Sequence, residues 1–135
     1  MEVSAALDVV RRQHHAVLAT VRGDGHPQLS PVAAGVLDGA VVISSRQTAL
    51  KVLNLRRRPY ASLCVFPDGF YGSWVQVEGP TEVVSLPEAM EPLVAYYRQV
   101  AGEHPDWDEY RRAMEDERRV IIRLSVERAG PDRSG

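Results

Sequence analysis

Residues 17–30 read VLATVRGDGHPQLS, and this stretch decides the fold class. It begins with a short, β-branched apolar run that is typical of a strand. The Gly-Asp-Gly sequence at residues 23–25 is a strong turn signal, so we expect the chain to return as the second arm of a hairpin over residues 28–37. Pro27 and Pro31 on this arm cannot donate to a hydrogen-bond ladder, which indicates an edge, a bulge or a side that faces a ligand.

Similar signals extend the antiparallel pattern along the chain. Asp38-Gly39 is a second hairpin turn and leads into an apolar run at residues 40–44, which makes three antiparallel strands in succession. Further strands are predicted at residues 60–66, 71–84 and 120–127. The second of these is expected to bend at Gly79-Pro80, and the residues from Ala129 onward are interpreted as a loose tail.

Capping residues predict four helices between these strands. The expected N-caps are Ser4, Thr48, Ser85 (in a capping box with Glu88) and Asp106. The second helix covers residues 49–57, and the third ends near Gly102. Hairpin strands with helices set between them do not match alternating β–α–β units. We therefore predict a mainly β (α+β) fold, an antiparallel barrel of about six or seven strands with peripheral helices, in a single domain over residues 1–135.

The composition excludes several classes of protein. The 135 residues include 16 basic and 18 acidic side chains, with a net charge of −2, which disfavours a nucleic-acid binder. No apolar run approaches the roughly 20 residues that a membrane span needs, and the chain start lacks the pattern of a signal peptide, so we expect a cytoplasmic protein with no membrane partner. Cys64 is the only cysteine and the four histidines lack ligand spacing, so no disulfide and no metal site are expected.

Residues 44–54 carry the strongest chemical signal, because here a predicted strand ends and a predicted helix begins. Ser44, Ser45 and Thr48 supply hydroxyl groups, and Lys51 is the only lysine in a chain that otherwise uses arginine. The free N–H groups and the dipole of a first helical turn favour an anion. These residues therefore predict a phosphate cradle, with ordinary helix capping by Thr48 beside a solvated Lys51 as the alternative.

Two further features are candidates for ligand contact. The arginines at residues 56–58 are either ordinary cations at a helix C-terminus or a basic rim for an acidic cofactor tail. Trp74, beside Phe70 and Tyr71, either packs in the core or forms a wall for a flat heterocycle. The chain has no sequence motif for nucleophilic or metal-assisted hydrolysis, so no catalytic residue is assigned. An enzyme with this sequence would rely on a bound cofactor for its reactivity.

Five segments together resemble a known family. They are residues 25–30 (GHPQLS), 44–59, 74–79 (WVQVEG), 101–114 and 118–124. In this order they resemble the split β-barrel flavin and deazaflavin oxidoreductases, the superfamily of pyridoxamine 5′-phosphate oxidase. The most similar branch uses the deazaflavin coenzyme F-420 in actinobacteria. The resemblance covers about residues 12–128.

The resemblance implies a homodimer that binds two cofactors at its interface. It implies that Lys51, Ser44 and Thr48 grip the cofactor phosphate, although Ala49 stands where some relatives carry an arginine. It also places Asn54 near the cofactor, and the flat ring against the strand with Pro27, Gln28 and Ser30.

We accordingly expect a split β-barrel oxidoreductase that transfers a hydride from coenzyme F-420 to a flat conjugated small molecule. An FMN-dependent oxidoreductase of the same fold is one alternative. A non-catalytic cofactor carrier or haem-binding protein is the other.

Overall fold

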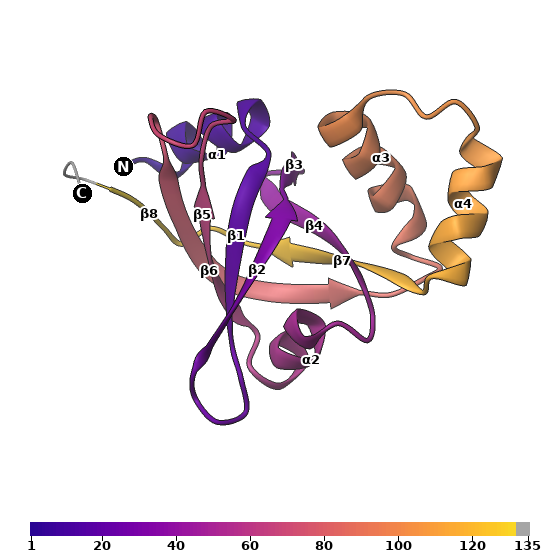
Figure 1. Cartoon of the computed structure of the whole chain (residues 1–135), viewed down its shortest axis with the longest axis horizontal. Coiled ribbons are helices and arrows are strands. Elements are labelled where there is room, and N and C mark those ends of the chain that lie inside the picture. The colour runs from indigo at the N-terminus through magenta and orange to yellow at the C-terminus, as the bar shows by residue number, and fades with distance from the viewer. Residues whose placement is uncertain (132–135) are drawn as a thin grey trace.

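The strands of the computed structural model, which describes residues 1–131, pair only in the antiparallel sense and curl into a half-barrel (Figure 1). They are β1 (His15–Val21), β2 (Pro27–Ala33), β3 (Gly35–Leu37), β4 (Ala40–Arg46), β5 (Tyr60–Val65), β6 (Val75–Val84), β7 (Arg119–Leu124) and β8 (Arg128–Gly130). Their order in the sheet is β2-β1-β5-β6-β7-β4-β3, and β8 pairs with β6. The predicted antiparallel split barrel is confirmed, with at least one strand more than expected. The prediction of one arm over residues 28–37 is wrong, because this segment divides into β2, which pairs with β1, and β3, which pairs with β4.

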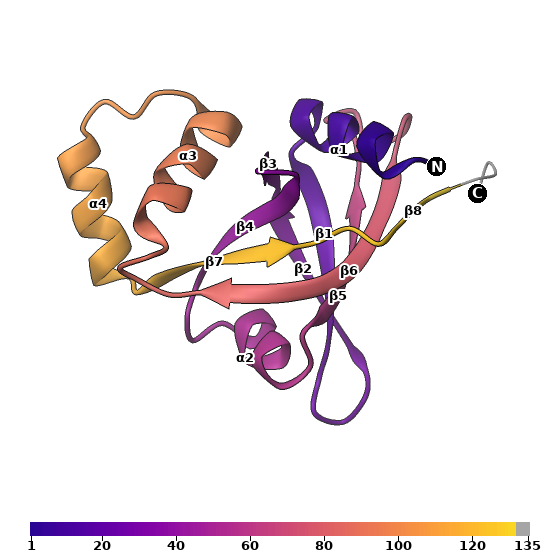
Figure 2. The same cartoon turned by 180° about the vertical axis from the view of Figure 1, so that it is seen from behind.

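Four helices of residues 1–131 surround the sheet. They are α1 (Val3–Arg12), α2 (Leu50–Arg57), α3 (Met90–Ala101) and α4 (Trp107–Asp116). α3 and α4 form a hairpin at one side of the barrel, while α1 and α2 lie at opposite ends of it (Figures 1 and 2). Within the described residues, no helix is long and apolar enough to cross a membrane.

The long strand β6 joins the two halves of the sheet. Its first half pairs with β5 and its second half with β7, so the strand changes partner near Gly79 and Pro80, where the sequence predicts a bend. A Cβ atom on Gly79 would lie 1.9 Å from the carbonyl oxygen of Ser125. The close approach of these two backbone segments therefore requires glycine at this position.

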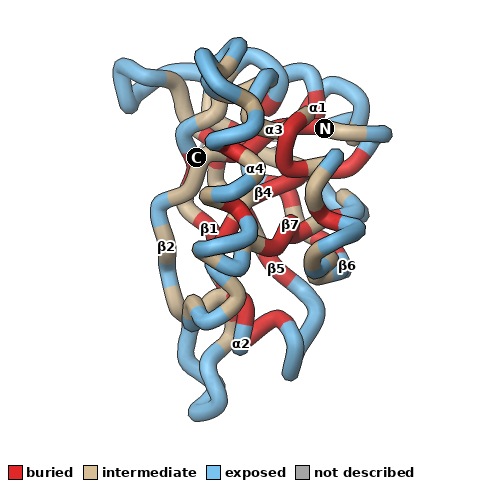
Figure 3. Tube along the Cα trace, turned by 90° about the vertical axis from the view of Figure 1, so that its right-hand side faces the viewer, coloured by how far each residue is buried: buried red, intermediate tan, exposed pale blue. Residues whose placement is uncertain are grey.

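Two groups of buried side chains stabilise the fold, and buried residues gather where β1, β4, β5 and β7 meet (Figure 3). The larger group fills the barrel and includes Leu18, Leu63 and Ile122. The smaller group includes Ile121 and Leu93 and lies between the sheet and the α3–α4 hairpin. Because successive residues of β7 enter different groups, this strand is buried on both faces.

Several predicted element ends are wrong. Ser4 lies inside α1, and the caps of α1 and α2 are Glu2 and Ala49, neither of which forms a side-chain capping bond. Asp106 is confirmed as a cap, since its carboxylate accepts from the N–H groups of Asp108 and Glu109 at 3.1 and 3.2 Å.

The capping box at Ser85 is also wrong. α3 begins only at Met90, and the Ser85 hydroxyl accepts a hydrogen bond from Arg56 instead. Ala129 and Gly130 pair with β6 rather than forming a tail. The rest of the predicted tail, residues 132–135, lies outside the described residues.

Gly79→Ala tests the close approach of the backbone at Gly79 to the backbone at Ser125. We expect a loss of about 2–3 kcal/mol in the free energy of unfolding, the scale of overpacking a filled site, measured by urea denaturation. Gly69→Ala is the control, because nothing lies within 4 Å of a Cβ atom there. Equal denaturation midpoints for the two variants would contradict the assignment of Gly79.

Candidate functional site

An open hollow of about 370 Å³ lies where β4 leads into α2. The residues that line it are Ser44, Ser45, Arg46, Ala49, Lys51 and Arg119. The structure thus brings together Ser44, Ser45 and Lys51, as the sequence predicts, and adds two arginines that the sequence analysis missed. Arg46 is a direct neighbour of the predicted residues in the sequence, whereas Arg119 reaches the hollow through strand pairing.

The two arginines are an unfavourable pair in the absence of a ligand. Arg46 and Arg119 are register partners across β4 and β7, and like charges directly opposite each other destabilise a sheet. Burial, together with the charge of Arg119, lowers the pKa of Lys51 from its ordinary value of 10.5. The hollow therefore gathers three basic side chains in one place, an arrangement that favours an anion.

Glu117 lies close to both arginines. Its Oε1 accepts from Nε and Nη2 of Arg119 at 3.0 and 2.7 Å, and it lies 3.5 Å from Nη2 of Arg46. These two guanidinium groups lower the pKa of Glu117. One carboxylate therefore offsets part of the charge of three basic groups.

Two predicted phosphate or cofactor residues lie apart from the hollow. Thr48 is exposed and does not line it. Asn54 is buried, where its amide donates to the Thr20 hydroxyl at 3.1 Å and accepts from Arg57 at 2.9 Å. Since its side chain connects α2 to β1, Asn54 has a structural role here, and its contact with a cofactor stays a prediction.

The predicted ring-binding residues of β2 divide between its two faces. Gln28 and Ser30 are half-buried and pair in register with Thr20 and Leu18, which are buried, so they lie on the inner face. Pro27 is exposed and belongs to the outer face. β2 also packs against α2 and β4, so the inner face of this strand lies towards the elements that form the hollow.

Trp74 lies away from Lys51, on the outer face of the sheet. It lines an aromatic hollow of about 410 Å³ together with Cys64, Phe66, Phe70, Tyr71 and Gly72. A smaller hollow of about 200 Å³ adjoins it through Cys64 and extends over β1 to Leu29.

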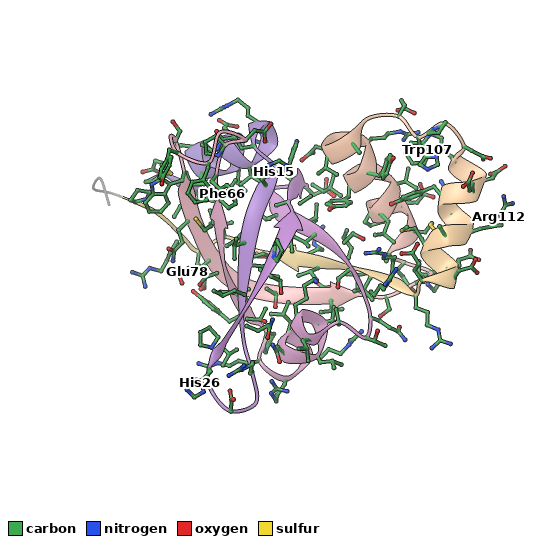
Figure 4. The ribbon with its side chains drawn as sticks, viewed as in Figure 1. His15, His26, Phe66, Glu78, Trp107 and Arg112 are labelled. Carbon is green, nitrogen blue, oxygen red and sulfur yellow. The ribbon has the colours of Figure 1, made fainter. Side chains whose placement is uncertain are left out.

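A third hollow, of about 270 Å³, continues from Trp74 past Gln76 to Glu78. In Figure 4, Phe66 and Glu78 mark two separate places along this face, with His15 beside Phe66. The predicted site residues of one chain thus fall in two places, around Lys51 and around Trp74.

The side chains of this outer face offer binding rather than strong acid–base chemistry. Burial raises the pKa of the Cys64 thiol, so the reactive thiolate is disfavoured. Phe70 and Tyr71 are 61% and 85% exposed, and such aromatic side chains can contact a flat ligand or a second protein surface. In residues 1–131, no group of three or more His, Cys, Asp or Glu side chains is placed to hold a metal ion.

The antiparallel split barrel, with a hollow lined by basic side chains beside α2, is consistent with what comparison with known families shows. The family model of pyridoxamine 5′-phosphate oxidase matches residues 3–131, and the chain belongs to this family.

Solved structures show the same fold. The conserved hypothetical protein Rv2991 from Mycobacterium tuberculosis is 26% identical, with 100% of this chain and 92% of that chain covered and a TM-score of 0.79. An F420 reductase is 21% identical, with 91% and 94% covered and a TM-score of 0.70. A heme binding protein from Mycobacterium smegmatis is 23% identical, with 95% of this chain but 55% of that chain covered and a TM-score of 0.70.

The lowered pKa of Lys51 makes anion binding sensitive to pH. The protonated lysine attracts an anion, so affinity is full below its pKa and falls as the pH rises through it, earlier than an exposed lysine would allow. We expect the thermal stabilisation by inorganic phosphate to decrease in the alkaline range, at a lower pH than for a site with a solvent-exposed lysine. In Lys51→Arg the fading should be much reduced, because arginine stays charged. An identical pH profile in both proteins would exclude Lys51 as the cause.

Proposed function

We propose that the protein is a coenzyme F-420-dependent oxidoreductase that transfers a hydride to a flat, conjugated small molecule. The observation that carries the proposal is the convergence of Arg46, Lys51 and Arg119, with the hydroxyl-bearing Ser44 and Ser45, on one hollow. Like charges opposite each other destabilise a sheet, and the single carboxylate of Glu117 offsets only part of the charge of the arginine pair, so a ligand anion would be favourable here. The residues present therefore fit the phosphate of a nucleotide-like cofactor.

The rest of the chain supports redox chemistry by a bound cofactor. When bound, a reduced deazaflavin supplies the hydride, and a proton from water or a side chain completes the reduction. The family includes oxidoreductases, and one protein of the same fold is an F420 reductase. The aromatic hollow beside Trp74 offers a flat, apolar wall for the acceptor. The rate of hydride transfer would then depend on how closely the protein aligns the cofactor with the acceptor.

Coenzyme F-420 is favoured over FMN by the resemblance of the sequence to the deazaflavin branch and by the arginines at the end of α2. Arg56 and Arg57 each use one nitrogen for bonds to Ser85 and to β1, while Arg58 is exposed. These cations suit an acidic cofactor tail. FMN stays the alternative, because the hollow around Lys51 fits its phosphate equally well.

A homodimer completes this proposal. In one chain the hollow around Lys51 and the aromatic hollow lie in separate places, and a cofactor whose phosphate binds in the first must present its ring to an acceptor held in the second. The aromatic hollow is open, and Leu29 beside it is 61% exposed. A second copy of the chain that covers this face would bury these side chains. It would also bring its own hollow around Lys51 close to the aromatic hollow of the first copy.

The mass in solution tests this arrangement. Size-exclusion chromatography with light scattering is expected to give twice the chain mass of 15.0 kDa. Leu29→Asp, which places a charge on the outer face, should shift the mass towards the monomer, whereas Leu50→Asp, at an exposed leucine of α2, should not. A stable monomer of the wild-type protein would overturn the dimer.

Binding and turnover test the function itself. Titration with coenzyme F-420 and with FMN, followed by fluorescence, is expected to show tighter binding of coenzyme F-420. Lys51→Ala should weaken that binding by about 1.5–3 kcal/mol, the range for a hydrogen bond to a charged group. Arg12→Ala is the charge-matched control, since Arg12 is exposed and does not line the hollow.

The reaction is then followed anaerobically with stereospecifically deuterated reduced cofactor and a panel of enones, quinones and tetrapyrroles. Deuterium in the product is the expected result. A carrier or haem-binding protein, a second candidate supported by the open aromatic hollow, would bind without turnover. Tight binding of FMN with none of coenzyme F-420 would reverse the choice of cofactor.

A further inference from the structure

The turn between α4 and β7 is braced against the segment that forms the anion hollow. The chain reverses at Arg118, which adopts a left-handed conformation with φ of 53°. Such a conformation is uncommon outside glycine and is unfavourable for a residue with a Cβ atom. The carbonyl oxygen of Arg118 accepts from the N–H of Gln47 at 3.0 Å, one residue beyond the end of β4. The two segments therefore hold each other in place.

The residues on either side of this reversal are the paired Glu117 and Arg119. Two nitrogens of the Arg119 guanidinium, Nε and Nη2, donate to the same oxygen of Glu117. Within residues 1–131, Nη1 forms no hydrogen bond. A planar guanidinium held through two of its donors has one orientation, and its third nitrogen is left for another acceptor.

Glu117 contacts two side chains that line the hollow but does not line it itself. A carboxylate that competed with the ligand anion would occupy the hollow itself. Glu117 also lies further from Arg46, at 3.5 Å, than from Arg119, at 2.7 Å. The contacts of Glu117 therefore orient the Arg119 side chain and leave the hollow open.

We propose that Glu117 is a positioning residue of the anion site, which holds the Arg119 guanidinium so that its free nitrogen meets the ligand phosphate. This inference rests on the proposed cofactor site and assigns a role to a residue outside it. It makes an unusual prediction about charge. Removing a negative charge beside an anion site should strengthen anion binding if charge alone matters. If Glu117 positions Arg119, the same change weakens binding.

The test is the affinity of the full-length protein for coenzyme F-420 and FMN, measured by fluorescence titration. Glu117→Gln is expected to raise the dissociation constant about tenfold, the scale of one charge-assisted hydrogen bond. Glu117→Asp, which keeps the charge on a shorter side chain, should retain part of the affinity. Glu115→Gln is the matched control, because it makes the same change of charge two residues away on an exposed side chain.

A second measurement reports on Arg119 without any cofactor. In the NMR spectrum, the Nε–H signal of Arg119 should be protected from exchange with water in the wild-type protein and in Glu115→Gln. It should be lost in Glu117→Gln. Circular dichroism and thermal melting check that each variant is folded.

Two results of the binding experiment would overturn the inference. One is unchanged or tighter binding in Glu117→Gln, and the other is an equal loss in Glu117→Gln and Glu115→Gln. Lys51→Ala tests the proposed function separately from the role of Glu117. The proposed function predicts that Lys51→Ala loses affinity for the cofactor, whether or not Glu117 positions Arg119. If the wild-type protein binds neither cofactor, the proposed function fails. Independently of binding, an unprotected Arg119 Nε–H signal in the wild-type protein would overturn the role of Glu117.

Discussion

The pairing of β4 with β7 is the interaction on which the rest of the structure depends. These strands are far apart in the chain, yet their register aligns Ser44 and Ser45 with Ile121 and Val120 and sets Arg46 opposite Arg119. β7 is buried on both faces: one face packs in the barrel core, and the other packs against the α3–α4 hairpin. One ladder of backbone hydrogen bonds thus fixes both the core and the positions of Arg46 and Arg119 at the hollow.

Local signals account for the parts of the fold that the sequence predicts well. The turns at residues 23–25 and 38–39 and the cap at Asp106 involve only neighbouring residues, and the structure has the hairpins and the helix that they predict. Ser4, Thr48 and Ser85 misled because a capping pattern does not show whether tertiary contacts allow the helix to begin there. For Ser85, the competing partner is Arg56, which is distant in sequence.

The same distinction applies to the candidate site. Ser44, Ser45 and Lys51 lie within one short segment, so helix geometry alone brings them together. Arg119 enters the hollow only because β7 pairs with β4, from which three helices and two strands separate it in the sequence, and no spacing rule reveals this. Asn54 is close to Lys51 in sequence, but its amide bonds to Thr20, a contact with a distant strand that the sequence does not reveal.

The position of β7 between β6 and β4 also constrains how the molecule can form. During synthesis, β1 to β6 emerge first, and the edges of β4 and β6 that β7 will join are unpaired until the chain has grown beyond residue 124. Contacts of such large sequence separation are slow to form, and open strand edges invite association with other chains. The hollow that Arg119 lines therefore cannot exist on a nascent chain or on a chain truncated before β7, and a ligand that binds there would stabilise only the finished barrel.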